Sequence, residues 1–451
     1  MKRAIEEMRA VRRGDTTMRQ MRRAILVGVM LCGVAARAQV AAPPTEAADA
    51  AIVHALRERD DYRAAIRALD QEHDRWVDTI VQLTEVPAPP FKEAARARVY
   101  AAMFKEAGLS DVRIDEVGNV LGLRRGTGAP GGKMVIMAAH LDTVFPDGTP
   151  VKVRRDGTRL HAPGVGDDST GLATQLSLIR AMAAAKIATP LDILFVGNVG
   201  EEGLGDLRGV RHLFSQPAYR DRAAAFFSID GAAEDGFTVG GVGSKRYRLV
   251  YKGPGGHSYG AFGLVNPMAA MAATVTGLYA LPTPTDPKTT YSASVVGGGT
   301  SVNAIPREIT LEVDMRSESA AALASLERDF LAVVDRSVAD ENAARSVKQG
   351  AVTVEKVPVG DRPAGATPVT DPLVRLGVAA YREEKIAPRL TSSSTDANVP
   401  MGLGIPAVTL SRAAVGDRGH SPDEWIETAR APSQRVKRLG LLMLLAAAGL
   451  R

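Results

Sequence analysis

Residues 134–144 read Met-Val-Ile-Met-Ala-Ala-His-Leu-Asp-Thr-Val, and the rest of the chain is organised around this stretch. Its first six residues are apolar or small, which is typical of a strand buried in a mostly parallel sheet. His140 and Asp142 follow at the carboxyl end of that strand. Two residues apart on an extended chain, their side chains point to the same side. Open α/β sheets bind ligands at this edge, so the pair is a candidate site, although an ordinary loop can also hold a His and an Asp.

Two further apolar strands end in acidic residues. Residues 191–196, Leu-Asp-Ile-Leu-Phe-Val, precede Glu201 and Glu202, and residues 225–229 precede Asp230. Adjacent carboxylates at the end of a buried strand repel each other and resist desolvation unless a cation lies nearby. The pattern therefore predicts a cluster of ligands at one edge of the sheet.

A glycine-rich turn supplies another carboxylate. Residues 160–171 read Leu-His-Ala-Pro-Gly-Val-Gly-Asp-Asp-Ser-Thr-Gly, and their glycines let the backbone bring a side chain to a crowded point. A helix is predicted from about Ser169 to Ala185. Asp168 is expected to cap this helix, which makes Asp167 the better candidate for chemistry. Near the C-terminus, His420 in Gly-His-Ser-Pro-Asp-Glu adds a second imidazole.

The composition is that of an ordinary globular protein. The chain has 451 residues, of which 45% are hydrophobic and 24% charged, and it is long enough for two domains. Its formal charge is +5, but residues 1–38 hold nine Lys or Arg against three Asp or Glu, so the remainder carries −1. Because the basic residues concentrate at the N-terminus, we expect no nucleic-acid partner.

The N-terminal segment has the pattern of a secretory signal peptide. Three arginines within residues 19–23 precede a short apolar run at residues 24–36, and an A-x-A cleavage site ends at Ala38. A membrane anchor is the alternative, although the run is shorter than the ~20 residues that a span needs. We expect a periplasmic or secreted mature chain from Gln39, without stable membrane association. The only cysteine, Cys32, lies in this segment, so a metal site must use His and carboxylates.

The texture of the chain changes twice. Residues 45–75 are helical and charged, and from about residue 245 alternating strands and helices follow a β-α-β-β-α-β-like order, which predicts a small inserted α+β domain. After a Gly/Pro/Asp-rich stretch at residues 359–368, the sequence again has the pattern of alternating helices and buried strands. Residues 431–450 are expected to form a helix packed on the sheet. The predicted parts are a signal peptide at 1–38, the first part of a catalytic domain at 39–244 with the helical extension at 45–75, an inserted domain at 245–357, and the second part of the catalytic domain at 358–451.

Five motifs, in order, resemble those of the co-catalytic dizinc exopeptidases and deacylases. This family includes peptidase T, carnosinase-type dipeptidases, glutamate carboxypeptidase, acetylornithine deacetylase and succinyl-diaminopimelate desuccinylase. The motifs are His-x-Asp at 140–142, Gly-x-x-Asp-Asp at 164–168, Glu-Glu at 201–202, the strand-end Asp230, and Gly-His at 419–420. The resemblance extends from about Trp76 to the C-terminus. It implies an α/β fold, with a zinc-exopeptidase-like, mostly parallel sheet flanked by helices and an inserted ferredoxin-like α+β domain that serves as a lid or for dimerisation.

The resemblance also implies a role for each motif. It predicts two Zn²⁺ ions, with Co²⁺ or Mn²⁺ as alternatives. The implied metal ligands are His140 and Asp230 on one ion, Glu202 and His420 on the other, and Asp167 on both. Asp142 would orient the ring of His140, and Glu201 would act as the general base. A cis peptide bond is expected between Asp167 and Asp168.

Three residues of the inserted domain match further family positions. His257, in Gly-Gly-His-Ser, matches a histidine that polarises the scissile carbonyl, often in the partner's active site, which implies a homodimer through this domain. Asn303 and Arg316 match positions that hold substrate in some members. Arg316 has a structural alternative, which is an ion pair with Asp314.

The expected function is that of a dizinc metallo-exopeptidase acting on small peptides, as a tripeptidase, dipeptidase or carboxypeptidase. Water held between the two ions would attack the amide with Glu201 as base. The alternatives are an N-acyl-amino-acid deacylase on the same scaffold and a metal-binding pseudoenzyme, and the presence of Glu201 argues against the latter. Ser169 stands where many members of the family have a Lys, which bears on the assignment to a subfamily and not on metal binding. Residues 394–398 resemble a loop that lines the substrate side in the family, and their role here is open.

Overall fold

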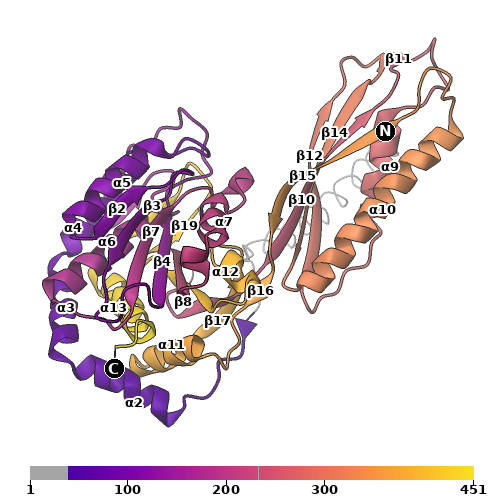
Figure 1. The fold of residues 1–451 in the computed structure, drawn as a ribbon. Helices are drawn as coiled ribbons and strands as arrows, with labels where there is room; N and C mark the ends of the chain where they lie inside the picture. The colour runs from indigo at the N-terminus through magenta and orange to yellow at the C-terminus, as the bar shows by residue number, and fades with distance from the viewer. Residues whose placement is uncertain (1–38, 232, 451) are drawn as a thin grey trace, which may run out of the picture. The chain divides into compact units, whose positions relative to one another are not determined.

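The apolar stretch that begins at Met134 forms the central strand β4 (Met134–His140), and all seven of its residues are buried. It pairs in parallel with β7 (Asp192–Asn198) on one side and with β8 (Ala223–Asp230) on the other. The carboxyl ends of these three strands therefore meet at one edge of the sheet. The computed structural model describes residues 39–231 and 233–450 (Figure 1), and the predicted signal peptide lies outside these residues.

The large sheet has the strand order β1-β17-β9-β18-β8-β4-β7-β3-β2, with β16 beside β9. The strands not yet given bounds are β1 (Gln39–Val40), β2 (Ser110–Ile114), β3 (Val120–Arg124), β9 (Gly236–Gly241), β16 (Gly365–Ala366), β17 (Arg389–Ser393) and β18 (Ala407–Ser411). The central strands β18, β8, β4 and β7 run parallel, as predicted, but β2, β3 and several outer pairs are antiparallel, so the sheet is mixed. A connection as short as that between β2 and β3 can join only antiparallel strands.

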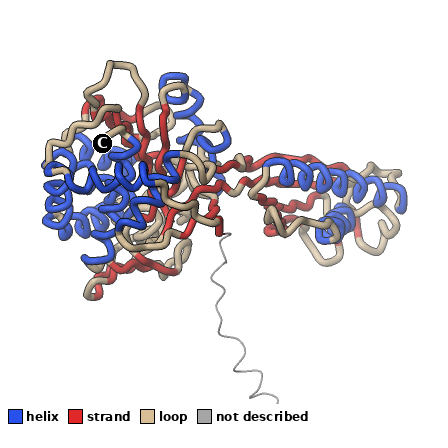
Figure 2. Tube along the Cα trace, turned by 90° about the horizontal axis from the view of Figure 1, so that it is seen from below, coloured by secondary structure: helices blue, strands red, loops and turns tan. Residues whose placement is uncertain are grey.

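Helices cover both faces of this sheet, as Figures 1 and 2 show. Val135, Met137 and Ala139 face one hydrophobic cluster, whereas Met134, Ile136 and Ala138 face another, as the alternation along a strand requires. The helices on the first side are α2 (Ala47–Glu58), α3 (Asp60–Gln71), α4 (His73–Thr84), α5 (Ala94–Glu106), α6 (Ser169–Ala184), α11 (Pro372–Glu383) and α13 (Arg430–Ala447). Those on the second are α7 (Arg208–Ser215) and α12 (Asn398–Gly402). The predicted fold class is confirmed.

Strands β10, β12, β14 and β15 form a second, antiparallel sheet in the order β12-β14-β10-β15. Its elements are β10 (Gly243–Lys252), α9 (Pro267–Tyr279), β12 (Thr289–Gly298), β14 (Glu308–Ser317), α10 (Ala320–Ala344) and β15 (Thr353–Arg362). This is the predicted β-α-β-β-α-β order, and α9 and α10 share one hydrophobic cluster with the sheet (Figure 1). β15 continues past residue 358, and the domain boundaries given above stay a prediction.

Two small sheets complete the described structure. β11 (Gly256–His257) pairs with β13 (Ala304–Ile305) inside the inserted part. The strands of the other sheet are β5 (Arg154–Asp156), β6 (Arg159–His161), β19 (Val415–Asp417) and β20 (Trp425–Glu427). Within residues 39–231 and 233–450, no helix is both long enough and apolar enough to cross a membrane.

A lysine is buried where α13 packs on the N-terminal helices. The side chain of Lys437 is 1% exposed, and its Nζ lies 4.3 Å from the centre of the Trp76 ring. Within residues 39–231 and 233–450, this ammonium group has no hydrogen-bond partner. Burial lowers the pKa of Lys437 from 10.5 to about 7, although nearby Glu72 favours the charged form. The folded protein therefore loses stability when this group has to be charged.

We predict that Lys437→Met stabilises the protein at neutral and acidic pH. Between pH 10.5 and about 7 the unfolded chain binds a proton at Lys437 that the folded chain does not, so the free energy of unfolding falls by about 1.4 kcal/mol per pH unit as the pH is lowered. Below about pH 7 this penalty is constant. Thermal unfolding of wild type and variant at pH 6, 8 and 9.5 measures it, and the gain in Tm should shrink as the pH rises.

Lys356→Met is the matched control, since Lys356 forms an ion pair with the largely exposed carboxylate of Asp335. This control should change Tm little at any of the three pH values. A lower Tm of Lys437→Met at every pH would show that the contact with Trp76 outweighs the cost of burying the ammonium.

Candidate metal centre

Potential metal ligands from distant parts of the chain meet at the carboxyl edge of the large sheet. They form three groups, of which two share Asp167 and the third consists of His140, Glu201 and Glu202, and in each group one ligand atom of every member lies within 4.8 Å of the others. The first group is His140, Asp167, Asp168 and Asp230, and the second is Asp167, Glu202 and His420. Asp167 belongs to both groups, which is the arrangement that a carboxylate shared between two ions requires.

His140, the last residue of β4, is buried and held through both ring nitrogens. Its Nε2 lies 3.0 Å from Asp167 Oδ1, and its Nδ1 lies 3.0 Å from the backbone oxygen of Asp142 and 3.6 Å from the carboxylate of that residue. The Asp142 carboxylate accepts hydrogen bonds from the backbone N–H groups of Glu201 (3.1 Å) and Glu202 (2.8 Å). Asp142 thus contacts the ring, as the sequence suggested, and also fixes the backbone that carries both glutamates.

The glycine-rich turn that presents Asp167 is held from outside by Glu424. The carboxylate of Glu424 accepts hydrogen bonds from the N–H groups of Gly164 (2.7 Å), Gly166 (3.0 Å) and Asp167 (2.9 Å). Burial, together with the charge of Asp167, raises the pKa of Glu424 to about 7. Three bonds from consecutive parts of one turn leave that turn little freedom, so Asp167 is presented from a fixed backbone.

Asp168 belongs to the helix rather than to the ligand set. One of its oxygens accepts the N–H of Gly171 at 3.2 Å, which caps α6 as predicted, and the other accepts the N–H of His140 at 3.1 Å. The peptide bond between Asp167 and Asp168 is cis, as the resemblance implied. Because both oxygens of Asp168 bond to backbone groups, Asp167 is the carboxylate left for an ion.

Asp167 also joins the second imidazole to the site. His420 Nε2 lies 3.3 Å from Asp167 Oδ2 and 3.0 Å from Glu202 Oε1. Arg412, which follows β18, places Nη1 3.2 Å from Asp167 Oδ1. Although burial opposes ionisation, Arg412, His140 and His420 together hold the pKa of Asp167 well below its ordinary value. Asp167 is therefore a carboxylate that stays charged.

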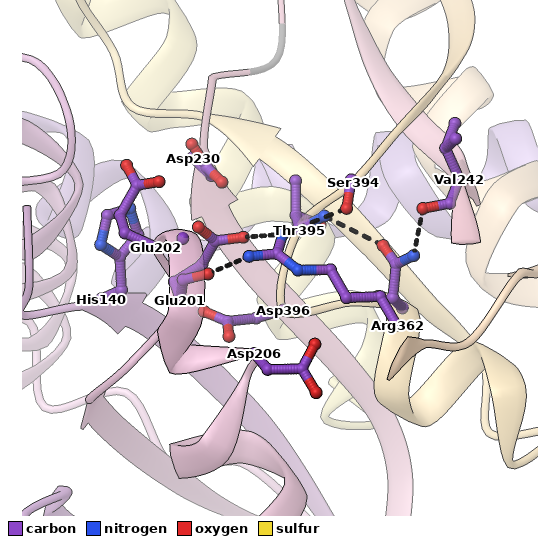
Figure 3. A network of polar contacts seen from close by, with 12 residues as sticks. His140, Glu201, Glu202, Asp206, Asp230, Val242, Arg362, Ser394, Thr395 and Asp396 are labelled. Atoms are coloured by element: carbon purple, nitrogen blue, oxygen red, sulfur yellow. Dashed lines mark hydrogen bonds and ion pairs between the residues drawn. The ribbon is translucent and has the colours of Figure 1, made fainter. Parts of the chain in front are cut away.

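Glu201 lies between the ligand groups and an arginine (Figure 3). A carboxylate oxygen of Glu201 lies within 4.8 Å of ligand atoms of both His140 and Glu202. Its Oε1 lies 2.9 Å from Nη1 of Arg362, and Nη2 of Arg362 donates to the backbone oxygen of Glu201. Burial raises the pKa of Glu201 strongly in spite of Arg362. The expected general base is thus beside the ligands and held by a cation.

Carboxyl groups outnumber cations around this edge of the sheet. The carboxyl groups are Asp142, Asp167, Asp168, Glu201, Glu202, Asp230, Asp396 and Glu424, and the cationic or protonatable groups are His140, His420, Arg96, Arg362 and Arg412. Burial raises the pKa of Glu202 and of Asp230, so these groups resist ionisation without further positive charge. Divalent ions would supply it, and an oxygen and imidazole donor set without thiolate suits zinc-like ions. The residues present therefore fit a dinuclear metal site.

The three candidates of the inserted part lie apart from this cluster. His257 is exposed, and its Nδ1 accepts the N–H groups of Tyr259 and Gly260 at 3.2 and 3.3 Å. Asn303 is exposed, and its Oδ1 accepts the hydroxyl of Ser301 at 2.6 Å. Arg316 pairs with Asp314 at 2.7 Å, which is the structural alternative raised above. Among the described residues of this single chain, no direct polar contact joins these candidates to the ligand groups, although Arg316 is linked through Asp314 and Arg246 to the backbone of Gly203. Their roles stay predictions.

Sequence reasoning did not single out Glu424, Arg412 or Arg362. Glu424 follows His420 by four residues in a stretch that was quoted, but only the tertiary structure shows which backbone it meets. Arg412 directly follows β18, which pairs in parallel with β8. Because ligand-binding residues often follow the carboxyl ends of parallel strands, Arg412 could have been chosen if β18 had been recognised as one of these strands. Arg362 ends β15 in a Gly/Pro/Asp-rich stretch without a pattern that marks it.

Comparisons with known proteins agree with this geometry. Residues 136–444 match the model of Peptidase family M20/M25/M40. A relative from Pyrococcus abyssi, named as a candidate LysW-lysine/LysW-ornithine hydrolase, is 29% identical over 178 residues, which are 39% of this chain and 46% of that protein. The alignment thus spans about half the length of that curated relative.

Solved structures show the same fold. The aminopeptidase PepT of Bacillus cereus has a TM-score of 0.66 at 21% identity, covering 83% of this chain and 99% of its own. The Bacillus subtilis YXEP protein, described as a dinuclear metal-binding peptidase of the M20 family, has a TM-score of 0.60 at 16% identity, covering 84% of this chain and 99% of its own. Since the family model matches more than half of the sequence, the chain belongs to Peptidase family M20/M25/M40.

Proposed function

We propose that this protein is a dinuclear metal-dependent exopeptidase that hydrolyses amide bonds of small peptides. The observation that carries the proposal is the pair of ligand groups that share Asp167, with the carboxylate of Glu201 beside them and outside the shared set. The proposed ligands are His140 and Asp230 for one ion, Glu202 and His420 for the other, and Asp167 for both. Zinc is the proposed metal because the donors are imidazoles and carboxylates, with Co²⁺ or Mn²⁺ as alternatives.

The reaction adds water across an amide. Two bound divalent ions would polarise the carbonyl and increase the acidity of water at the site. Glu201 then takes a proton from the attacking water and delivers it to the leaving nitrogen, so the C–N bond breaks, the acyl carbon gains a hydroxyl, and the amine gains the proton. Asp142 holds the backbone of Glu201 during these transfers. His257 is proposed to polarise the carbonyl, and Asn303 and Arg316 to hold substrate, when a second copy of the chain brings them to the site.

A cavity of about 440 Å³, which is in the range of pockets for small molecules, is lined by chain neighbours of the proposed ligands but by none of these ligands and not by Glu201. Gly166 and Arg412, which flank Asp167, and Gly419, which precedes His420, lie in its wall. A small peptide is the proposed substrate, and the likeness of the fold to PepT supports this choice over an N-acyl amino acid.

We predict that the chain from Gln39 binds two equivalents of zinc and that removal of one histidine ligand lowers this number. His420→Ala should bind about one equivalent, because Asp167 and Glu202 alone leave the second ion too few protein ligands. Elemental analysis after dialysis measures the content.

The control is His54→Ala, which removes an exposed histidine that also has a carboxylate partner, Glu383. This variant should keep the full metal content. Full zinc content in His420→Ala would remove that residue from the ligand set.

We predict that Glu201→Gln keeps its zinc and loses at least about a hundredfold in kcat, since general base catalysis contributes 10²–10⁴-fold. The assay compares a panel of free di- and tripeptides with N-acetyl and N-succinyl amino acids, which also separates the peptidase from the deacylase. Near-normal turnover by the variant would refute the role of Glu201. A metal-loaded wild type that cleaves none of these amides would favour the non-catalytic alternative.

We also propose that the protein works outside the cytoplasm as a homodimer. The support is the signal-peptide pattern of the first 38 residues and, for the dimer, the exposure of His257 on the inserted part. We predict that N-terminal sequencing of protein recovered from periplasm or medium begins at Gln39. An intact N-terminus on membrane-bound protein would support the anchor instead.

A further inference from the structure

The chain crosses between the two sheets twice, and one side chain holds both crossings. The first crossing, at Val242, leads from β9 to β10, and the second, at Pro363, leads from β15 to β16. Nδ2 of Asn398 donates to the backbone oxygens of Val242 (2.8 Å) and Pro363 (2.9 Å). Its Oδ1 accepts the N–H of Thr395 at 2.9 Å, so both the oxygen and the nitrogen of the side-chain amide are hydrogen-bonded to backbone groups. Asn398 is buried, and Figure 3 labels Val242, one of its two acceptors, together with Arg362 and Ser394.

Arg362 lies immediately before the second crossing. It is the last residue of β15, and its guanidinium contacts the carboxylate and the backbone oxygen of Glu201 together. Nη1 also donates to the hydroxyl of Ser394 at 3.1 Å. The side chains of Arg362 and Glu201 are 5% and 7% exposed, so solvent screens this pair little. A planar fork that grips both the side chain and the backbone of one residue fixes where that residue lies.

The loop that follows Glu201 contacts β10 and β15, the two strands at the crossings. Arg246 of β10 donates from Nη1 to the backbone oxygen of Gly203 at 2.9 Å, and the N–H of Asp361 in β15 donates to Asp206 Oδ1 at 3.0 Å. On its other side, the N–H of Glu201 is held by Asp142. The backbone of Glu201 is therefore fixed between the large sheet and the strands that lead into the inserted part.

We propose that Arg362 is a positioning residue that couples the orientation of the inserted domain to the place of the Glu201 carboxylate. The coupling works because β15 carries both the guanidinium and the crossing that Asn398 clamps, so a rotation of β15 about this crossing moves the group that grips Glu201. The residues 394–398, whose role the sequence left open, form the clamp: Ser394 contacts Arg362, and Asn398 holds the crossings. This inference rests on the proposed role of Glu201 as general base.

The first test is the pair Arg362→Lys and Arg248→Lys. A lysine keeps the charge but cannot grip the side chain and the backbone of Glu201 together. We predict that Arg362→Lys lowers kcat about 10- to 100-fold on the best peptide, with KM within about twofold and with unchanged zinc content, because a displacement of about 1 Å can cost 10² in rate. Arg248, which pairs with Glu312 on the surface of the inserted sheet, is the control and should leave kcat unchanged.

Three results would overturn the proposal. They are a normal kcat in Arg362→Lys, a raised KM with normal kcat, which would make Arg362 a substrate ligand, and a loss of zinc, which would make its role structural. The proposed function fails separately, if wild type cleaves no amide or if Glu201→Gln is fully active. An active wild type with an inactive Glu201→Gln and a normal Arg362→Lys refutes the coupling alone.

The second test measures the orientation itself. The chain from Gln39 contains no cysteine, so Arg67→Cys on α3 and Asp329→Cys on α10 provide two exposed spin-label sites, one on each part. Pulsed electron spin resonance then gives the distribution of distances between them. We expect Asn398→Ala to broaden this distribution and to lower kcat. Arg362→Lys should also lower kcat, but the distribution should stay narrow because Asn398 still holds both crossings. A broadened distribution in Asn398→Ala with normal kcat would show that the orientation does not govern Glu201.

Discussion

An excess of buried negative charge at one edge of the large sheet is the constraint on which the rest of the structure depends. Carboxylates taken out of water repel one another and are tolerated only where cations or hydrogen-bond donors face them. Here Asp167 is stabilised by Arg412 and two imidazoles, whereas burial leaves Glu202 and Asp230 with raised pKa values. Such a site costs stability until positive charge is added, and binding of divalent ions would therefore also stabilise the fold.

The carboxyl groups that do not face an ion are used to fix backbone. Asp142 holds the glutamate pair, Asp168 caps α6, and Glu424 holds the turn of Asp167, each by accepting N–H groups. Each of these carboxyl groups accepts at least two backbone N–H groups, so they limit how far the ligands can move. The proposed ligands that lie on loops, such as Asp167 and Glu202, thus gain rigidity comparable to that of His140 and Asp230 at the strand ends.

The inserted part is connected to this rigid edge through Glu201, the proposed general base, and the loop that follows it. Its two strands reach the loop after β7 through Arg246 and Arg362, and Asn398 holds the points where the chain crosses. An inserted domain that only covered the site would need no contact with Glu201. These contacts are the basis of the proposal that the orientation of that domain affects the position of Glu201.

Much of this protein was determined by the sequence itself, because the signals are local. The apolar run of β4 and its ending at His140, the capping Asp168 and the order of strands and helices after residue 245 each depend on neighbours in the chain. They predicted the fold class and the cluster of His and acidic residues that meets at the edge. The antiparallel outer strands were not predicted. A short connection explains only the pairing of β2 with β3, whereas β3 with β7 and β1 with β17 pair across long stretches of chain, which no local pattern encodes. The partners of Glu424, Arg412, Arg362 and Asn398 were decided only by the tertiary structure. Each of these side chains meets groups far away along the chain, and no local periodicity encodes such a meeting, since it arises only when the sheet edge and the crossing strands are packed together.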